Sequence, residues 1–500
     1  MILLSFGVLA GFGFLYLLFQ YLRHIWKLRD YPPGPFPLPI IGNLYQLKDS
    51  NFMTLKSLAK KYGDVLSVSL GHKRVVVVNA VEPAREALTK KSVEFAGRPQ
   101  DIFTAGQITR GFKDIAFADY GPVWQSIRKL AHTSLKLYGT GMEKMEDFIQ
   151  AEADDLCDRI AKANGAPIDP HQNLALAVIN IICSLVFGKR YNKDDPEFLN
   201  VVKYNTLITQ GFNHTKPVGF LPWLRFFPNE GYNKIDMGIA IRDVILRKQL
   251  DLHRQSFQPT NIRDLTDALI LEASKEESKD VNDRKFPTDD HLEMIIHDAF
   301  TAGSETTTTS LRWAHLLLLR NPKVQEKAAE EIAKVVGTER SPSLSDKEHL
   351  PYIKAVINEV LRISSVIPLG VPHKTTCETT LAGYRIPKGT QVLFNNWAMH
   401  HDERQWEDPY DFKPERWFDD DGNLIPEREK SFLPFSAGRR VCLGEVLAKT
   451  EIYLFLTRVL HKFRIEKVPG EGMPPQLSNR SVILSPKPFR VVYTPRAVKA

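Results

Sequence analysis

Apolar side chains recur every three or four positions along most of this chain, which is the period of an amphipathic helix. Helices with this period are predicted over residues 143–163, 174–187, 233–254, 291–320, 323–336, 352–363 and 444–460. Asn321-Pro322 separates two of them, because proline is tolerated in the first turn of a helix but not in its interior. The pattern therefore predicts a mainly helical protein.

Short segments of strand-like composition lie at both ends of this helical body. Residues 65–70 and 74–78 flank a turn-like dipeptide and predict a hairpin, and further strands are expected within 379–386 and 391–394. The charged stretch 278–290 is expected to be a surface loop. Because strands and helices do not alternate, the pattern excludes a doubly wound α/β fold and indicates a mainly α fold with a small β region.

The first 22 residues carry no charged side chain and are mostly apolar, and a run of this length can cross a bilayer core as a helix. Basic residues follow the run at Arg23, Lys27 and Arg29, whereas a cleaved signal peptide would normally start with them. By the positive-inside rule, the rest of the chain is expected on the cytosolic side. We therefore expect a single-pass membrane anchor at residues 1–22.

Residues 31–39 are rich in proline and follow the anchor closely. So much proline disfavours a helix and a central strand, so this stretch is interpreted as a stiff, extended connector. We expect three parts: the anchor, a basic and proline-rich connector at 23–50, and one large domain at 51–500. No linker, repeat or low-complexity tract divides that domain.

Composition and charge narrow the function only slightly. Apolar residues make up 43% of the chain and charged residues 25%, as in ordinary globular proteins. The formal net charge is +7, from 66 basic and 59 acidic residues, and the excess is spread along the chain. Without a basic block interleaved with aromatics, nucleic-acid binding is not expected. The excess suits a basic face for an acidic protein or an anionic membrane, or an ordinary soluble surface.

The chain has four cysteines, Cys157, Cys183, Cys377 and Cys442. They form no CxxC pair, so a zinc site is not expected, and their scarcity suits a reducing compartment. Cys183 lies among apolar residues and is expected to pack as a small hydrophobe. Cys442 lies where a turn-rich loop enters a helix, and the free N–H groups there favour a thiolate and lower the thiol pKa. A thiolate is one of the ligands that hold haem iron.

The residues around Cys442 suit a flat iron cofactor. Gly438 and Gly444 allow close approach of the backbone, Phe435 can pack beside a ring, and Arg440 can bind a carboxylate through two hydrogen bonds. A buried structural cysteine, the common alternative, does not explain these residues at these spacings. The segment resembles the haem-binding signature of the cytochrome P450 family, FxxGxRxCxG, at every fixed position.

A second segment resembles the AGx(D/E)T motif of the same family. Residues 302–309 place a glycine and four threonines inside a predicted helix, which weakens the helix locally. A tolerated kink is the simpler explanation, because hydroxyls compete for main-chain carbonyls. The resemblance implies instead an oxygen pocket in which Gly303 gives room, Thr306 hydrogen-bonds to dioxygen and Glu305 feeds protons through water.

Glu359 and Arg362 lie three residues apart on one helix face. Such a pair contributes only ~0–1 kcal/mol when it is exposed. Together with residues 414–417, however, the pair resembles the ExxR and PER elements of the family. The resemblance implies a buried, structural network of Glu359, Arg362 and Arg416.

Trp124 and Arg128, in a helical WxxxR spacing, resemble the residues that reach the haem propionates in this family. Arg98 and His373 are further candidates for the same role. Each of these four residues is, by itself, also compatible with an ordinary surface position.

The resemblance covers essentially the whole chain and implies the cytochrome P450 fold, with haem b (iron protoporphyrin) between the helices of Thr306 and Cys442. It implies a monooxygenase that takes electrons from NADPH indirectly, through NADPH–cytochrome P450 reductase, with cytochrome b5 as a further candidate partner. The reductase would dock on a basic face formed by Arg439, Arg440 and Lys449. The implied location is the endoplasmic reticulum membrane, with the catalytic domain facing the cytosol.

Within the family, several segments resemble the vertebrate steroid 17α-hydroxylase/17,20-lyase branch, namely residues 115–119, 222–225, 302–309 and 372–374. Tyr204-Asn205 matches a pair in which the asparagine contacts the A-ring oxygen of the steroid. The implied apolar wall consists of Phe117, Ala302, Val366, Val371 and Val482. A mostly apolar pocket with one polar anchor suits a rigid sterol.

Other interpretations stay open. Residues 101–113 and 206–214 depart from the steroid branch, and residues 444–449 resemble the aryl-hydrocarbon hydroxylase branch, so a broad-specificity or aryl-hydrocarbon monooxygenase is one alternative. A non-oxygenase haem protein of the same fold, an isomerase or a ligand binder, is another, although the oxygen-side acid and hydroxyl speak against it. Asn205 is equally compatible with a solvated helix position. Residues 220–227, with four aromatic rings, suit a membrane contact or a core helix turn.

Overall fold

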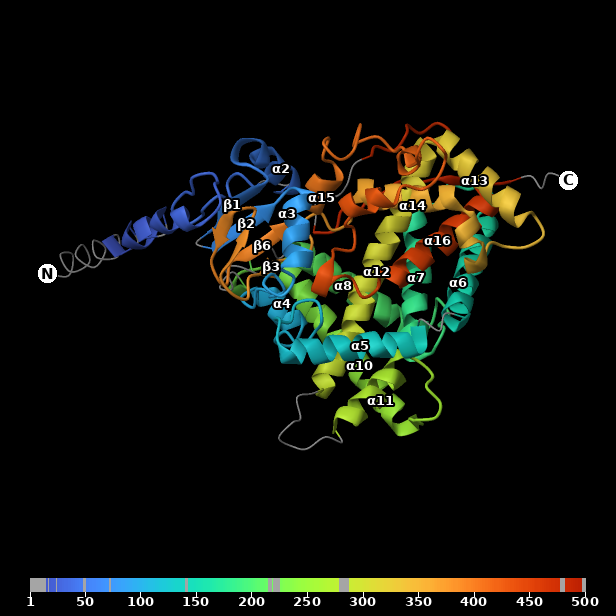
Figure 1. Ribbon diagram of the computed structural model, residues 1–500. Helices are drawn as coiled ribbons and strands as arrows, with labels where there is room; N and C mark the ends of the chain where they lie inside the picture. The colour runs from blue at the N-terminus through green and yellow to red at the C-terminus, as the bar shows by residue number, and fades with distance from the viewer. Residues whose placement is uncertain are drawn as a thin grey trace. The chain divides into compact units, whose positions relative to one another are not determined.

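The computed structural model describes residues 15–16, 18–23, 25–47, 51–71, 73–139, 143–214, 218, 225–277, 287–476 and 482–496. They form two compact units, each built from several stretches of chain. Unit 1 combines the described parts of Met1–Pro99, Ile367–Glu407 and Ser436–Val441, and unit 2 combines those of Gln100–Val366, Asp408–Phe435 and Cys442–Ala500. Helices dominate and the strands are few and short, which confirms the predicted mainly α fold with a small β region (Figure 1).

Unit 1 contains the larger sheet. Its elements are η1 (Lys27–Asp30), α2 (Asn51–Tyr62), β1 (Val65–Leu70), β2 (Lys73–Val78), α3 (Val81–Arg85), η2 (Glu86–Lys90), β3 (His373–Lys374), β4 (Thr379–Leu381), β5 (Tyr384–Ile386), β6 (Gln391–Phe394), α15 (Asn396–His400) and η7 (Gly438–Arg440). The sheet order is β1-β2-β6-β3 (Figure 1), with β1 antiparallel to β2, β2 parallel to β6, and β3 antiparallel to β6. The strands predicted at 65–70, 74–78 and 391–394 match β1, β2 and β6 to within one residue.

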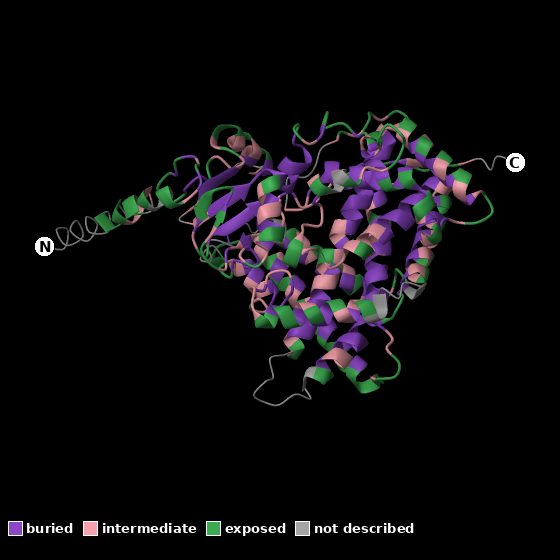
Figure 2. Cartoon of the chain, viewed as in Figure 1, coloured by how far each residue is buried: buried purple, intermediate pink, exposed green. Residues whose placement is uncertain are grey.

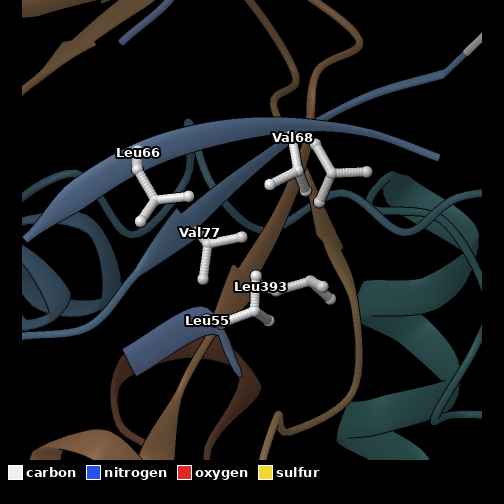
Figure 3. Close-up of a cluster of buried hydrophobic side chains, with 6 residues drawn as sticks. Leu55, Leu66, Val68, Val77 and Leu393 are labelled. Atoms are coloured by element: carbon white, nitrogen blue, oxygen red, sulfur yellow. The ribbon is translucent and has the colours of Figure 1, made fainter. Parts of the chain in front are cut away.

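The core of unit 1 lies between this sheet and α2. Alternate residues of a strand share one face, so β1 offers Leu66 and Val68 to the same side. Figure 3 shows these side chains meeting Val77 of β2, Leu393 of β6 and Leu55 of α2, and each is at most 9% exposed. Burying a side chain of this size contributes roughly 1.5–3 kcal/mol of hydrophobic free energy.

The proline-rich segment is packed along the outer edge of β1. Ser67 donates its N–H to Pro33 O (2.9 Å), and two residues later Ser69 donates its N–H to Asn43 Oδ1 (2.8 Å). Because proline has no N–H, the segment offers mainly acceptors to the strand edge. A Cβ on Gly34 would lie 1.8 Å from Ser67 O, so this close approach requires glycine. In this structure the segment is hydrogen-bonded within unit 1 and is not a free tether.

Unit 2 contains the long helices. Its elements are α4 (Phe103–Ile108), α5 (Pro122–Gly139), α6 (Glu143–Lys162), α7 (Pro170–Phe187), α8 (Pro196–His214), α10 (Glu230–Ser256), α11 (Leu265–Glu277), α12 (Asp289–Arg320), α13 (Pro322–Val336), η4 (Leu344–His349), α14 (Pro351–Ser364), η5 (Pro414–Trp417), η6 (Pro426–Ser431), α16 (Glu445–Lys462), β7 (Phe463–Glu466) and β8 (Val492–Pro495). α12 packs along α7, α10 along α8, and α16 against α6 and α12. In Figure 2, α7 and α12 are largely purple, because most of their residues are buried.

The seven helices predicted from periodicity correspond to α6, α7, α10, α12, α13, α14 and α16, with ends that differ by at most four residues. The prediction of a loop over 278–290 is wrong at its C-terminal end, because Asp289 and Asp290 form the first turn of α12. Carboxylates there are stabilised by the positive end of the helix dipole. Apolar periodicity did not predict the helices α5 and α8.

Among the described helices, α7 is the one long and apolar enough to cross a membrane, and 72% of it is buried inside the protein. A buried apolar helix of this kind is typical of a core. Residues 1–14 of the expected anchor lie outside the described residues, so the anchor stays an expectation.

Candidate functional site

The loop that carries Cys442 ends at Gly444, the N-cap of α16. The Cys442 N–H donates to Phe435 O (3.0 Å), which closes the loop, and the Gly444 N–H bonds to the thiol. Cys442 is exposed, but enough protein surrounds the thiol that desolvation raises its pKa, and the Gly444 N–H and Arg128 offset this rise only in part. The expectation of a lowered pKa is therefore wrong for the thiol without a metal ion.

Arg128 and Trp124 lie one turn apart on α5 and contact each other. The guanidinium carbon of Arg128 is 5.4 Å from the centroid of the Trp124 ring, a cation–π distance. The Trp124 indole N–H donates to Ile115 O (3.0 Å), and the ring is buried. Burial lowers the pKa of Arg128, whereas nearby Cys442 raises it. Arg128 and Cys442 are thus within electrostatic reach of each other, while the Trp124 N–H is already bonded within the protein.

α12 presents an open face at the expected oxygen segment. Ala302 is exposed and Thr306, one turn along, is half-buried, although the helix beyond is buried. The Thr306 hydroxyl donates to Ala302 O (2.6 Å), so its oxygen keeps lone pairs that can accept a hydrogen bond. Burial raises the pKa of Glu305, and Arg312 and a long hydrogen bond from Thr309 (3.5 Å) lower it in part. A carboxyl whose pKa is raised toward neutral pH suits proton transfer.

Two motif glycines lie where protein segments pack closely. Gly303 on α12 faces α7, and a Cβ there would lie 2.9 Å from Ile182 Cδ1. Gly438 in unit 1 has a left-handed backbone (φ +69°), and a Cβ there would lie 1.7 Å from Leu88 O. The sequence suggested room for oxygen at the first position and for a cofactor at the second. The structure gives a packing reason for both.

Glu359, Arg362 and Arg416 form one buried network in unit 2. Arg362 donates from Nε and Nη2 to the two oxygens of Glu359, both at 2.8 Å, and Arg416 Nε donates to Oε1 at 3.0 Å. Trp417 Nε1 and the Lys413 backbone N–H donate to the same carboxylate at 3.0 and 3.1 Å. The side chains of Glu359 and Arg362 are 0% exposed. The network joins α14 to η5, as expected of a network whose role is structural.

Arg98, His373 and Arg440 lie in unit 1, and each is bonded to main-chain carbonyls. His373 Nδ1 (2.7 Å) and Arg440 Nε (2.8 Å) bond to carbonyls of residues 95–96, and Arg98 Nη1 donates to Pro372 O (3.0 Å). A carbonyl only accepts, so His373 carries a proton on Nδ1. Burial and the charges of Arg98 and Arg440 hold the pKa of His373 well below its usual range, so the ring is neutral. Arg440 is buried, so it is not part of the exposed basic face expected from the sequence.

One of the residues expected to contact the substrate is a buried polar residue. Asn205 on α8 is 4% exposed, and neither its Oδ1 nor the hydroxyl of Tyr204 has a hydrogen-bond partner among the described residues. The alternative of a solvated helix position for Asn205 is therefore wrong. The Leu484 N–H donates to Val366 O (2.8 Å), which places the segment of Val482 beside Val366. The half-buried wall residues are Phe117, Val366, Val371 and Val482.

Two charged residues on α12 were missed as site candidates. Asp298 accepts the N–H groups of Ile115 (2.7 Å) and Ala116 (3.3 Å), and burial together with Asp114 raises its pKa well above the usual range. Arg312 is buried at 5% exposure. Both are ionisable residues within a helix that is largely buried, a rare placement unless they are paired or functional. That signal in the sequence would have identified them.

Comparison with known proteins supports one family. A family model described as Cytochrome P450 matches residues 32–493. The steroid 17-alpha-hydroxylase/17,20 lyase of Ictalurus punctatus is 39% identical over 478 residues, which cover 94% of this chain and 93% of that protein. Cytochrome P450 2U1 of Bos taurus is 36% identical over 500 residues, which cover 94% and 91%. The chain belongs to the cytochrome P450 family.

A solved structure supports the fold of this cytochrome P450. The structure described as "Zebra fish cytochrome P450 another structure with Progesterone" is 38% identical and superposes with a TM-score of 0.80. The match covers 89% of this cytochrome P450 and 99% of the solved chain. At this identity and coverage, family and fold agree, and this chain is a cytochrome P450 monooxygenase.

The cytochrome P450 family implies a haem-thiolate cofactor, and residues of this chain fit one. Cys442 offers an exposed thiol with a backbone N–H on its sulfur, whereas Cys157 and Cys183 are buried. The buried position of Cys183 was expected. The charge of Arg128 acts on the Cys442 thiol, and its guanidinium can bind a carboxylate such as a propionate. A bound iron ion would favour the thiolate and so reverse the raised pKa of Cys442.

Proposed function

We propose that this cytochrome P450 hydroxylates a steroid, in the manner of a steroid 17α-hydroxylase/17,20-lyase. The observation that carries the proposal is the buried amide of Asn205, whose oxygen has no partner among the described residues. A buried polar group without a partner costs about 1–3 kcal/mol, so a ligand that pairs with it gains specificity. A rigid apolar substrate with an oxygen at one end suits such a group. The names of the relatives, and the description of the zebra fish structure with progesterone, point to the same class.

A broad-specificity or aryl-hydrocarbon monooxygenase is the second candidate. Cytochrome P450 2U1 of Bos taurus, whose name specifies no steroid, is 36% identical to this chain. Residues 101–113 and 206–214, which depart from the steroid branch, support the same alternative. The two candidates share the chemistry and differ in the substrate.

In the proposed site, the Cys442 thiolate would hold the haem iron. When bound, haem b supplies the oxygen chemistry, with electrons that come from NADPH through the reductase. Residues proposed to hold the ring and its propionates are Arg98, Trp124, Arg128, His373, Phe435 and Arg440. Support for Arg128 comes from its charge, which acts on the Cys442 thiol.

The remaining site residues are proposed to handle protons and substrate. Glu305 is proposed to release and take up a proton at a carboxyl oxygen, and burial raises its pKa, which favours the protonated form. The hydroxyl of Thr306, the next residue, donates to Ala302 O, so its oxygen is free to accept. By accepting a hydrogen bond there, Thr306 would hold a proton donor in the oxygen pocket. Asn205 orients the substrate through its amide. The wall of Phe117, Ala302, Val366, Val371 and Val482 excludes water.

The proposed partners and location follow from microsomal relatives. NADPH–cytochrome P450 reductase, and cytochrome b5 as a further candidate, would dock on basic side chains near Cys442. Arg439 is exposed and suits this role, whereas Lys449 is paired with Glu445 (2.6 Å). We infer a single-pass anchor at residues 1–22 in the endoplasmic reticulum membrane. Of the proposed membrane contact at 220–227, residues 220–224 lie outside the described residues, and the two phenylalanines that follow Arg225 are exposed.

An optical titration of the haem-loaded protein tests the substrate class. Progesterone should produce a saturable spin-state shift, and a planar polycyclic hydrocarbon should not. Asn205→Leu should weaken progesterone binding roughly three- to tenfold, the value of one hydrogen bond of ~0.5–1.5 kcal/mol. Thr206→Val, at the next and exposed position of α8, is the matched control and should bind as the wild type does. A shift with the hydrocarbon alone would favour the broad-specificity candidate.

A further inference from the structure

Arg312 is a buried cation on α12 with few protein partners. Its side chain is 5% exposed, and its Nη2 donates to Pro486 O (3.2 Å). Within the part of the chain that the structure describes, its Nε has no hydrogen-bond partner and its guanidinium forms no ion pair. A buried charge needs nearby charges or ordered water to replace its lost hydration. Arg312 therefore needs polar surroundings beyond this one carbonyl.

Helix packing places Arg312 near the beginning of α7. Phe300 packs on Phe187, with ring centroids 5.4 Å apart, and Gly303 lies against Ile182. The contact positions rise along α12 as they fall along α7, so the two helices are antiparallel. At 1.5 Å per residue in both helices, this register continues from Gly303 to bring Arg312 to the level of the first turn of α7.

The C-terminal segment 486–491 also relates Arg312 to the beginning of α7. Pro486 accepts the hydrogen bond of Arg312, and five residues later Val491 pairs with Ile168 through backbone bonds of 2.9 and 3.0 Å. Ile168 lies two residues before α7, whose N-cap is the exposed Asp169. One short segment therefore contacts both Arg312 and the residue that precedes the α7 N-terminus.

His171, in the first turn of α7, has unused hydrogen-bonding capacity. Its Nδ1 is buried and has no partner among the described residues. Burial and the charge of Arg312 lower the pKa of His171, and burial lowers the pKa of Arg312 while Asp169 and Glu305 raise it. Asp169 and His171 at the surface, and Glu305 in the site, are thus all within electrostatic reach of Arg312.

Between Arg312 and Glu305, α12 carries a row of hydroxyls. Glu305, Thr308, Thr309 and Arg312 are three or four residues apart, so they share one face of the helix. Long side chains on a helix point toward its N-terminus, which directs Arg312 toward Glu305. Thr309 Oγ1 donates to Glu305 (3.5 Å), and the buried Thr308 Oγ1 has no partner in the described chain.

We propose that His171 and Arg312 line the route by which protons reach Glu305 from the surface at the start of α7. A proton enters at His171 and passes along ordered water held by Arg312 and the hydroxyl row. It binds one Glu305 oxygen after that carboxyl has released its own proton toward Thr306, so the carboxyl returns to its starting state. Arg312 keeps its protons throughout and is a positioning residue. The inference rests on the roles of Glu305 and Thr306 in the proposed function.

The test compares Arg312→Gln with the wild type in the haem-loaded chain with reductase, using as substrate whichever titrant gives the spin-state shift. Product formed per NADPH should fall roughly three- to tenfold, less than the 10²–10⁴-fold contribution of a general acid itself. The solvent isotope effect on product formation should rise. Product formation driven by cumene hydroperoxide, an oxidant that needs no proton from this route, should equal that of the wild type.

Two variants separate charge from structure. Arg312→Lys keeps the cation and should restore coupling to within about twofold of the wild type. Arg320→Gln, on the same helix, removes a guanidinium that donates to Pro474 O (2.6 Å) outside the row, and should leave coupling unchanged. Wild-type coupling in Arg312→Gln would overturn the proposal, as would an equal loss of the hydroperoxide-driven activity.

Further variants keep the test decisive. If Arg312→Gln fails to bind haem, His171→Leu at the half-buried entrance replaces it, with the same expected loss of coupling and the same outcome that overturns the proposal. Glu305→Gln and Thr306→Ala distinguish the two levels of inference. If both lower coupling while Arg312→Gln does not, the route alone is wrong. If neither lowers coupling, the proposed roles of Glu305 and Thr306 are wrong as well.

Discussion

Arg362 and Glu359 meet fully buried on α14 through two hydrogen bonds of 2.8 Å. Three further donors, from Arg416, Trp417 and the Lys413 main chain, complete the bonding of the same carboxylate. A buried ion pair offsets its desolvation only when each oxygen and N–H is matched, and here two oxygens receive five bonds. Loss of one cation would leave a buried charge without compensation.

Arg362→Leu should therefore lower the free energy of unfolding by about 3–5 kcal/mol, the cost of breaking a buried pair. Denaturant unfolding measures this, and the haem content of the purified protein should fall with it. The matched control is Lys327→Ala, which removes an exposed pair with Glu415 (3.1 Å) and should cost at most ~1 kcal/mol. Equal effects of the two variants would contradict the structural role.

A comparison of two left-handed glycines tests the close approach at Gly438. Gly438→Ala should cost more than about 4 kcal/mol, because its Cβ would overlap Leu88 O, 1.7 Å away. Gly383→Ala is the control: its φ is +82° and no atom lies within 4 Å, so only the backbone strain of roughly 1–2 kcal/mol remains. Thermal unfolding measures both variants. A similar cost for the two would mean that the Leu88 contact relaxes easily.

We predict that His253 makes a pH-dependent contribution to the free energy of unfolding. Both ring nitrogens face acceptors, Gln249 O at 2.7 Å and Asp264 Oδ2 at 2.8 Å, so the protonated imidazole can donate to both. Burial lowers the pKa of His253, but the bond to Asp264 and the charge of Asp267 outweigh it and leave the pKa raised. Because the folded pKa exceeds the unfolded value of about 6.5, this stability is complete below pH 6.5 and is lost as the pH rises through the folded pKa.

His253→Gln removes this contribution. The difference in unfolding free energy between the wild type and the variant should be largest near pH 6 and should shrink at alkaline pH. His349→Gln, at an exposed position, serves as the control and should change stability little at any pH. A difference that grows with pH would show that His253 is neutral in the folded protein.

Cys442→Ala should abolish haem binding and leave a folded protein. The matched control is Cys377→Ala, which removes the other exposed cysteine and should retain haem. Absorbance of the haem relative to protein, and circular dichroism, measure the two properties separately. Haem retained in Cys442→Ala at the wild-type level would disprove the assigned ligand.

Periodicity identified the elements whose apolar pattern is strong, such as α12 and α14, whose apolar faces are buried against neighbouring helices. α8 was missed because polar residues such as Lys203 and Thr206 interrupt its pattern, and its stability comes from packing on α10. Local motifs pointed to Cys442 and Glu359, because each motif consists of residues that lie close together in the sequence. The buried state of Asn205 and the direction of the Cys442 pKa shift depend on atoms from distant segments, which no local pattern encodes.

The hydrogen bonds between the proline-rich segment and β1 have a consequence for shortened forms of the protein. A chain that begins near residue 30 keeps Pro33 and Asn43 as acceptors for the outward N–H groups of Ser67 and Ser69. A chain that begins near residue 47 loses both acceptors and exposes a bare strand edge. Such an edge recruits strands from other molecules, so the shorter form should aggregate during expression while the longer one stays monodisperse.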